Sequence, residues 1–444
     1  MAPRIPLPSL MHRLRTAHPL APSMRRDLTE FDRAGHDELR TFQNRRLRRM
    51  VTWAARTSPF YRSWFADNDI SPNEVRTQDD LRLLPLIDRT QLTASPERFC
   101  SYPRKLMWEA RSSGTSGQVV TVFRTPGSSA YELCALQRQW GWFGLDREAR
   151  RVVIRAAGGG LDEDEPQTLA TVVPGAKQLL VSGYALGRAD PGRLIGTVRE
   201  FGPDALEGWP SSLATFASIL DRRGETLPLQ AVITSSEVMT SQQVQTLQRV
   251  FDAPVVDHYG QTERVSLAGS CEAGGYHQFP DYGITELLPV PGKDEQWEIV
   301  GTPLHNWGFP LLRYRTGDTV GPAPEGPCPC GRSFPLMGSI GGRAEDFFTA
   351  IDGTPIPLPA TAIDDVVGLE EVQIVQRAPG RFEVLMVPRP ATDVLAVETQ
   401  VRRNVDRYFG RGQSVRFVVV EHIPRPPSGK LKPAVIDEQD GGRA

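Results

Sequence analysis

The first clear hydrophobic pattern along the chain is an amphipathic stretch over residues 37–65. Apolar side chains recur there at helical spacing in DELRTFQNRRLRRMVTWAARTSPFYRSWF, until Ser58-Pro59 interrupts the repeat. Because proline lacks a backbone N–H, the pattern predicts a helix that is broken at this point. We expect this segment to form a helical entry to the main domain.

Short apolar runs alternate with helix-like segments through the middle of the chain. The runs RVVI (151–154), QLLV (178–181) and AVIT (231–234) have the length and β-branched content of buried strands, whereas residues 242–251 have helical periodicity. Strands that alternate with helices are typical of an α/β domain. The expected fold class is therefore α/β.

The periodic elements start afresh after Gly341-Gly342. Beyond residue 366 come a strand EVQIVQR, a strand RFEVLMV, a helix over 394–408 and a strand VRFVVVEHI. This order is typical of a small α+β domain of about a hundred residues. We therefore expect two domains, residues 1–341 and residues 342–444, with a hinge between them.

Composition narrows the classes of partner. The 51 Lys and Arg residues nearly balance the 53 Asp and Glu residues, so no basic surface for nucleic acid is expected. No segment approaches the roughly 18 uninterrupted apolar residues of a membrane span, and prolines interrupt the first 24 residues where a secretory signal would be apolar. We expect a cytoplasmic protein with small-molecule partners, either a monomer or a homodimer.

Two glycine-containing segments carry groups suited to a nucleotide. In SSGTSG (112–117), glycines let backbone amides approach a polyphosphate, and the hydroxyls add donors. In DHYGQTE (257–263), an aromatic ring, a hydroxyl and a carboxylate suit a base, a phosphate and magnesium. Taken alone, each segment also fits an ordinary polar turn.

Two later segments have the same character. The carboxylate of Asp318 in RYRTGD (313–318) can accept hydrogen bonds from both ribose hydroxyls, and Gly342-Arg343 follows it along the chain. Near the end, PRPPSGKLK (424–432) presents Lys430 in a loop. A further turn and a solvated lysine are the alternatives.

In order along the chain, SSGTSG, YGQTE, YRTGD, GRAED and PSGKLK resemble the core motifs of the ANL superfamily of acyl-CoA synthetases and related adenylating enzymes. The phenylacetate-CoA ligase branch is most similar, because SPFYRSWF and DDLRLLPLIDRTQL look like its N-terminal phrases. The resemblance implies a large N-terminal α/β domain and a small mobile α+β C-terminal domain. It also implies activation of an aryl or other carboxylic acid by ATP, through an acyl-adenylate with pyrophosphate release.

The resemblance also implies roles for single residues. Lys430 would bridge the acid and the α-phosphate, Thr262 would contact that phosphate, and Glu263 would hold Mg²⁺. A cation and a lysine are needed because two anions must approach one another. Tyr259 would lie against adenine, and Asp318 would hold the ribose. The nucleotide-binding set is Ser112, Ser113, Gly114, Thr115, Ser116, Gly117, Ser236, Glu237, Tyr259, Gly260, Asp318 and Arg343.

A further group of residues suits a metal. Cys271 and His277 precede Cys328 and Cys330 by some fifty residues, and similar members of this branch carry such a cluster. Three thiolates and one imidazole complete a tetrahedral Zn²⁺ set, which is typical of a structural site. The alternative is a set of unpaired buried cysteines beside a core histidine.

The acid pocket and the hinge are less defined. By resemblance the pocket would include Trp142, Trp209, Pro210 and Ser235, although tryptophans in a chain of this length are more often core residues. The hinge residue would be Glu345, where aspartate is common in the family.

The acceptor of the acyl group is open at this point. The phosphate loop has Gln118 where the family usually has lysine, and FFTAIDGTPIPLP replaces a glycine-bearing loop of CoA ligases. CoA is the family's default acceptor. An amine, a carrier-protein thiol, a hydroxyl or nitrite-dependent N–N bond formation remain alternatives, as does a non-catalytic nucleotide-binding homologue.

Overall fold

The structure is a computed structural model of the 444-residue chain. It describes residues 17–111, 120–155, 169–173, 177–183, 186, 189–237, 239, 241–291, 295–341, 348–356, 359–363, 366, 368–388, 391–421, 423 and 434–436. None of the helices formed by these residues has both the length and the apolar character needed to cross a bilayer.

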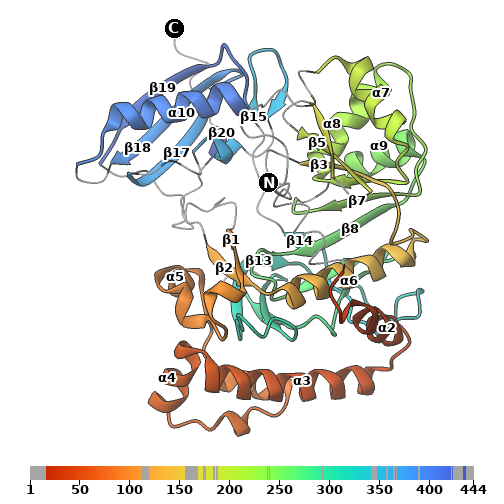
Figure 1. Ribbon diagram of the computed structural model, residues 1–444, viewed down its shortest axis with the longest axis vertical. Coiled ribbons are helices and arrows are strands. Elements are labelled where there is room, and N and C mark those ends of the chain that lie inside the picture. Colours follow the sequence, from red (N-terminus) through yellow and green to blue (C-terminus); the bar gives the residue numbers. More distant parts are fainter. Residues whose placement is uncertain are drawn as a thin grey trace, which may run out of the picture.

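The chain begins with helices that cover one end of the molecule (Figure 1). Helix α3 (His36–Thr57) ends where Pro59 opens α4 (Pro59–Asp67), which confirms the predicted break. The buried face of α3 packs on residues that include Phe309 and Leu312 from the middle of the chain. The remaining helical segments here are α2 (Ala21–Phe31), α5 (Arg89–Ala94) and the 3₁₀ helices Pro72–Glu74, Gln78–Leu83, Pro96–Phe99 and Arg104–Leu106.

The largest sheet has the strand order β10-β9-β8-β7-β6-β3-β5-β4. Its central strands β5, β3, β6, β7 and β8 run parallel, and β4, β9 and β10 are antiparallel at the two edges. The strands are β3 (Arg151–Arg155), β4 (Ala170–Val173), β5 (Gln178–Ser182), β6 (Ala205–Gly208), β7 (Ala231–Ser235), β8 (Val255–Gly260), β9 (Leu267–Ser270) and β10 (Tyr276–Gln278). The three strands expected from the apolar runs are thus confirmed.

Helices cover this sheet on both faces, as a mostly parallel sheet requires. One face packs against α7 (Pro191–Phe201), α8 (Pro210–Asp221) and α9 (Ser241–Phe251) through a single apolar cluster. The opposite face packs against α6 (Pro126–Trp142), whose Leu133 and Trp140 belong to one cluster with Ala231 and Ile233 of β7. The expected α/β class is confirmed.

A second, antiparallel sheet brings a distant part of the chain to the edge of the first one. It contains β11 (Gly283–Pro289), β12 (Trp297–Pro303), β13 (Tyr314–Val320) and β14 (Ile340–Gly341). A small apolar cluster that includes Ala268, Ile299 and Met337 joins the two sheets, and Tyr259 packs against it. The short pair β1 (Trp108–Arg111) and β2 (Thr121–Arg124) lies beside them (Figure 1).

The last part of the chain folds around an apolar cluster of its own, which runs from Phe348 to Phe409. Its sheet has the order β19-β18-β17-β20 and packs against one helix, as the tail pattern predicts. The elements are β15 (Phe348–Thr349), β16 (Pro355–Ile356), the 3₁₀ helix Pro359–Ala362, β17 (Leu369–Ala378), β18 (Arg381–Pro388), α10 (Val394–Tyr408), β19 (Ser414–Val419) and β20 (Ala434–Ile436). The boundary at residues 341 and 342 adjoins a stretch outside the described residues, so it stays a prediction.

Candidate active site

Two of the predicted motifs meet where β8 ends beside β13. The hydroxyl of Tyr259 donates to Oδ2 of Asp318 at 2.9 Å. A second hydrogen bond has its tyrosine in the other motif: the hydroxyl of Tyr314 donates to Oε1 of Glu263 at 3.0 Å. Each motif therefore supplies one tyrosine and one carboxylate to the other, which fixes the positions of both acids.

Burial strengthens this crossed pairing. Tyr314 is 2% exposed and Glu263 is 9% exposed, so their hydrogen bond lies out of water. Burial, and then the charge of Asp318, raises the pKa of Tyr259 well above its ordinary value. The Tyr259 hydroxyl is consequently a permanent donor to Asp318 at neutral pH, and its ring is uncharged.

Two arginines that the sequence analysis did not single out stabilise the turn that carries Thr262 and Glu263. Arg124, at the end of β2, donates to the carbonyl oxygen of Thr262 at 2.8 Å. Arg264 has a left-handed backbone (φ +56°), and its guanidinium forms an ion pair with Glu132 of α6. A charged residue directly after the TE pair was the available signal, but its partner comes from a helix far away along the chain.

Other predicted residues lie at the same edge of the large sheet. Because β6, β7 and β8 are parallel, their carboxyl ends meet on one side. Ser235 ends β7, and Ser236 follows in a left-handed conformation (φ +73°). Trp209 and Pro210 follow β6, with Pro210 opening α8. The predicted positions Glu237, after β7, and Gly260, the last residue of β8, belong to the same edge.

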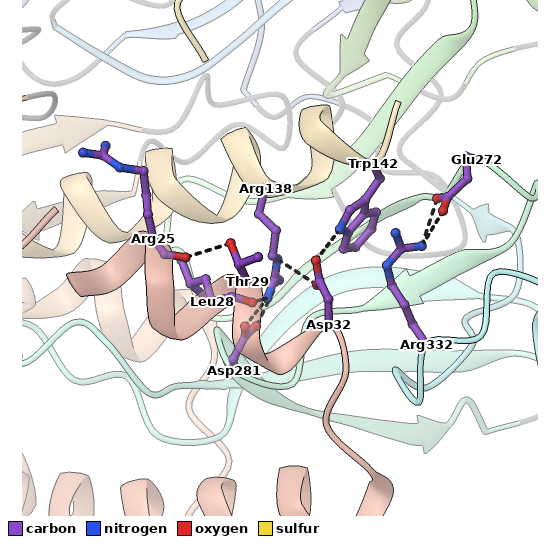
Figure 2. Close-up of polar contacts among 9 residues, drawn as sticks. All are labelled: Arg25, Leu28, Thr29, Asp32, Arg138, Trp142, Glu272, Asp281 and Arg332. Atoms are coloured by element: carbon purple, nitrogen blue, oxygen red, sulfur yellow. Dashed lines mark hydrogen bonds and ion pairs between the residues drawn. The ribbon is translucent and has the colours of Figure 1, made fainter. Parts of the chain in front are cut away.

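Trp142 lies in a buried polar network instead of at those strand ends (Figure 2). Its indole Nε1 donates to Oδ2 of Asp32 at 2.9 Å, and the Arg332 guanidinium lies 4.1 Å from the centroid of its ring. Phe279 and Phe334 contact the same ring. These contacts account for its partly buried position against the apolar core, and its assignment to the acid pocket stays a prediction.

The same network fixes the N-terminal helix to the body of the molecule. Arg138 of α6 donates to the carbonyl oxygen of Leu28 in α2 at 3.0 Å and forms a bidentate ion pair with Asp281 (Figure 2). Asp281 is 1% exposed, so the Arg138 guanidinium takes the place of water as the partner of this carboxylate. Asp32 lies 3.6 Å from the Arg138 Nε and completes the group.

The predicted metal ligands come together in three dimensions. Ligand atoms of Cys271, His277, Cys328 and Cys330 all lie within 4.8 Å of one another. The Cys271 and Cys328 sulfurs are 3.6 Å apart, far beyond the about 2.05 Å of a disulfide and close to the roughly 3.8 Å edge of a tetrahedral zinc–thiolate site. Nε2 of His277 lies 3.3 Å from the Cys330 sulfur.

The surroundings of the cluster also suit a metal. Nδ1 of His277 lies 2.9 Å from the carbonyl oxygen of Phe334, an arrangement that directs Nε2 toward the thiols, as the outer partners of metal-bound histidines do. A side chain at Gly275 would approach the Cys328 sulfur to 2.6 Å, so the loop between the first two ligands needs glycine there. The donor set therefore fits Zn²⁺.

Several expected residues lie outside the described part of the chain. They are the phosphate-loop residues Ser112, Ser113, Gly114, Thr115, Ser116 and Gly117, the ribose residue Arg343, the hinge residue Glu345 and the lysine Lys430.

Comparison with known proteins shows which sequences this chain resembles. A sequence model of the CapK C-terminal domain matches residues 359–438. A phenylacetate-coenzyme A ligase of Thermus thermophilus is 27% identical over 380 residues, which are 80% of this chain and 82% of that protein. Protein CapK of Staphylococcus aureus is 22% identical, and the match covers 90% of this chain and 89% of that protein.

Solved structures share the fold. The structure of 2-hydroxyisobutyryl-CoA ligase in complex with 2-HIB-AMP and CoA in the thioesterification state has a TM-score of 0.62, with 19% identity and 91% of each chain covered. An open conformation of the same ligase has a TM-score of 0.55, and the match covers 91% of this chain and 93% of that one. The similar sequences are thus phenylacetate-CoA ligases and CapK, and the fold is the predicted one of the ANL acyl-CoA ligases.

Proposed function

We propose that this enzyme activates a carboxylic acid with ATP, releases pyrophosphate, and transfers the acyl group from the adenylate to an acceptor. The crossed pairing of Tyr259 with Asp318 and of Tyr314 with Glu263 is the observation that carries the proposal. It puts a stacking ring and two carboxylates at the edge of a parallel sheet, where α/β proteins bind nucleotides. The relatedness to phenylacetate-CoA ligases supports the same activity.

Each group has a defined task in this proposal. Tyr259 lies against adenine, Asp318 accepts the ribose hydroxyls, and Thr262 contacts the α-phosphate. Tyr314 occupies Oε1 of Glu263, so we assign Oε2 to Mg²⁺. The cation and Lys430 offset the repulsion between the incoming carboxylate and the phosphate.

The acid is proposed to be an aryl or another carboxylic acid, with CoA as the acceptor. Trp209, Pro210 and Ser235 at the sheet edge supply a ring and a hydroxyl for such a substrate. The names of the phenylacetate-CoA ligases support both assignments.

A different acceptor is the second candidate, and the segment that begins at residue 348 favours it. This segment forms a short hairpin of β15 and β16, closed by Gly353 at φ +82°, and its sequence differs from the loop that the resemblance to CoA ligases implies at this place. An amine, a carrier-protein thiol or a hydroxyl would then attack the adenylate, or nitrite would replace the carboxylic acid. The match to the CapK C-terminal domain begins just after this hairpin.

Pyrophosphate release separates these candidates. The purified enzyme would be given ATP and Mg²⁺ with aryl acids, aliphatic acids, amino acids or nitrite, each with and without CoA. Release that depends on one acid class supports the proposal, and dependence of AMP release on CoA supports thioester formation. Absence of acid-dependent release across the panel, with ATP still bound, would favour a non-catalytic homologue.

Replacement of Tyr314 by phenylalanine is expected to raise the Mg²⁺ concentration needed for half-maximal pyrophosphate release by about three- to tenfold. The change removes one hydrogen bond to a buried carboxylate, worth about 1 kcal/mol or slightly more. Titration of Mg²⁺ at saturating ATP measures the effect. The matched control is Tyr131→Phe, which removes another tyrosine hydroxyl, one that donates to the carbonyl oxygen of Asp281 at 3.0 Å. An unchanged Mg²⁺ requirement in Tyr314→Phe would contradict the role of Tyr314.

We further propose that Cys271, His277, Cys328 and Cys330 hold a structural Zn²⁺. Elemental analysis of the purified protein is expected to find about one zinc per chain. Cys271→Ser should lower both the zinc content and the midpoint of thermal unfolding. Cys100→Ser, at a cysteine outside the cluster, should leave the zinc content unchanged. A metal-free protein of full stability would refute the assignment.

A further inference from the structure

The strands that adjoin two of the metal ligands also contact the strand that carries Tyr259. Cys271 directly follows Ser270 of β9, and His277 directly follows Tyr276 of β10. Ser270 and Tyr276 are themselves cross-strand partners. Successive residues of a strand point to opposite faces. The side chains of Ser270 and Tyr276 are therefore expected on the face opposite to the metal ligands that follow them, Cys271 and His277.

Ser270 and Tyr276 both contact Asp257. The Tyr276 hydroxyl donates to Oδ2 of Asp257 at 3.0 Å. The backbone N–H of Asp257 donates to Oγ of Ser270 at 2.9 Å, and that hydroxyl lies 3.2 Å from the Asp257 carbonyl oxygen. Thr234 of β7 donates to the second carboxylate oxygen at 2.7 Å. Asp257 is thereby held from both sides of its strand.

Asp257 lies two residues before Tyr259 on the same strand, and the contacts extend to Tyr259 itself. Tyr259 pairs with Ala268 of β9, and the rings of Tyr259 and Tyr276 both pack on the apolar cluster that includes Ala268 and Met337. The backbone N–H of Met337, from the segment after Cys330, donates to the Tyr276 carbonyl oxygen at 2.8 Å. One short hairpin therefore adjoins two of the predicted metal ligands and pairs with the strand that carries Tyr259.

We propose that Tyr276 and Ser270 are positioning residues that couple the Cys271–His277–Cys328–Cys330 cluster to nucleotide binding. When the metal is bound, its protein ligands fix the β9–β10 hairpin. The hairpin in turn fixes Asp257 and Tyr259 in the position from which the Tyr259 ring contacts the adenine base. The inference rests on the proposed function, since it assigns the nucleotide to Tyr259 and a metal to the cluster. The inference gives the metal a role in nucleotide binding as well as in stability. Because coupling between two sites acts in both directions, nucleotide binding should also change the metal site.

Cobalt substitution tests this coupling in the folded, full-length enzyme. Co²⁺ takes the place of Zn²⁺ in tetrahedral thiolate sites, and its visible absorption bands report the geometry of its ligands. A non-hydrolysable ATP analogue with Mg²⁺ is expected to shift these bands in the wild-type protein. In Tyr276→Phe the bands should remain while their response to the analogue is lost. Calorimetry should show about fivefold weaker binding of the analogue, the loss expected for one hydrogen bond.

The control is Tyr131→Phe, whose missing hydroxyl belongs to α6 and donates to the Asp281 carbonyl oxygen, not to any atom of β8. It should keep both the cobalt response and the affinity for the analogue. Cobalt bands that do not respond to saturating analogue in the wild-type protein would overturn the coupling while leaving the metal site intact. Absence of cobalt bands would overturn the metal assignment and the coupling together, whereas the pyrophosphate assay tests adenylation separately.

Discussion

Lys430→Ala is expected to lower the rate of acid-dependent pyrophosphate release by about 10²- to 10³-fold, the loss typical of removing one preorganised donor from a developing anion. The lysine is proposed to lie between the incoming carboxylate and the α-phosphate, where its charge offsets the repulsion between the two anions. Single-turnover pyrophosphate release at saturating ATP and acid measures the effect. The change should act on kcat more than on the KM for ATP, since the nucleoside contacts proposed for Tyr259 and Asp318 remain.

The neighbouring lysine supplies the matched control. Lys432→Ala removes the same charge two residues further along the PSGKLK segment, and it should change the rate by less than about threefold, because the proposal gives this lysine no contact with the reacting anions. Transfer of the acyl group from a synthetic acyl-adenylate should also survive in Lys430→Ala, because that step no longer joins two anions. Equal losses in the two lysine variants, or equal losses in the two half-reactions, would contradict the assigned role.

Arg138→Met is expected to destabilise the protein by about 3–5 kcal/mol, because it leaves Asp281 charged, buried and without its bidentate partner. It also removes the hydrogen bond to the Leu28 carbonyl oxygen, so α2 should become more accessible to protease before global unfolding. Urea unfolding followed by tryptophan fluorescence measures the loss, since Trp142 lies beside Arg138 in the same network (Figure 2).

An exposed ion pair of similar geometry serves as the control, because it separates the effect of burial on stability from the effect of losing an ion pair. Arg249 contacts Asp221 through two hydrogen bonds of 2.6 and 2.9 Å at the protein surface. Arg249→Met should cost no more than about 1 kcal/mol, because water solvates the remaining carboxylate. Adding Asp281→Asn to Arg138→Met should restore part of the lost stability. Similar costs for Arg138→Met and Arg249→Met would show that the buried pair contributes little.

The elements that the sequence predicted well are those specified by local patterns. The break at Pro59, the strands β3, β5 and β7, and the order of elements after residue 366 all follow from apolar spacing and from proline chemistry. Spacing of this kind can be recognised in the sequence because apolar residues on the buried face of a strand or helix recur at the period of that element, independently of the rest of the chain. The environment of Trp142 could not be predicted, because its polar neighbours Asp32 and Arg332 come from segments far away along the chain.

The sequence by itself determined which chemical groups are available: a tyrosine, a threonine and a carboxylate in DHYGQTE, a carboxylate in YRTGD, and three cysteines with a histidine. Only the tertiary structure decided how they combine. Tyr259 and Asp318 are 59 residues apart along the chain, Tyr314 and Glu263 are 51 apart, and Cys271 and Cys328 are 57 apart. Local periodicity carries no information over such separations, because contacts between them depend on how the two sheets pack.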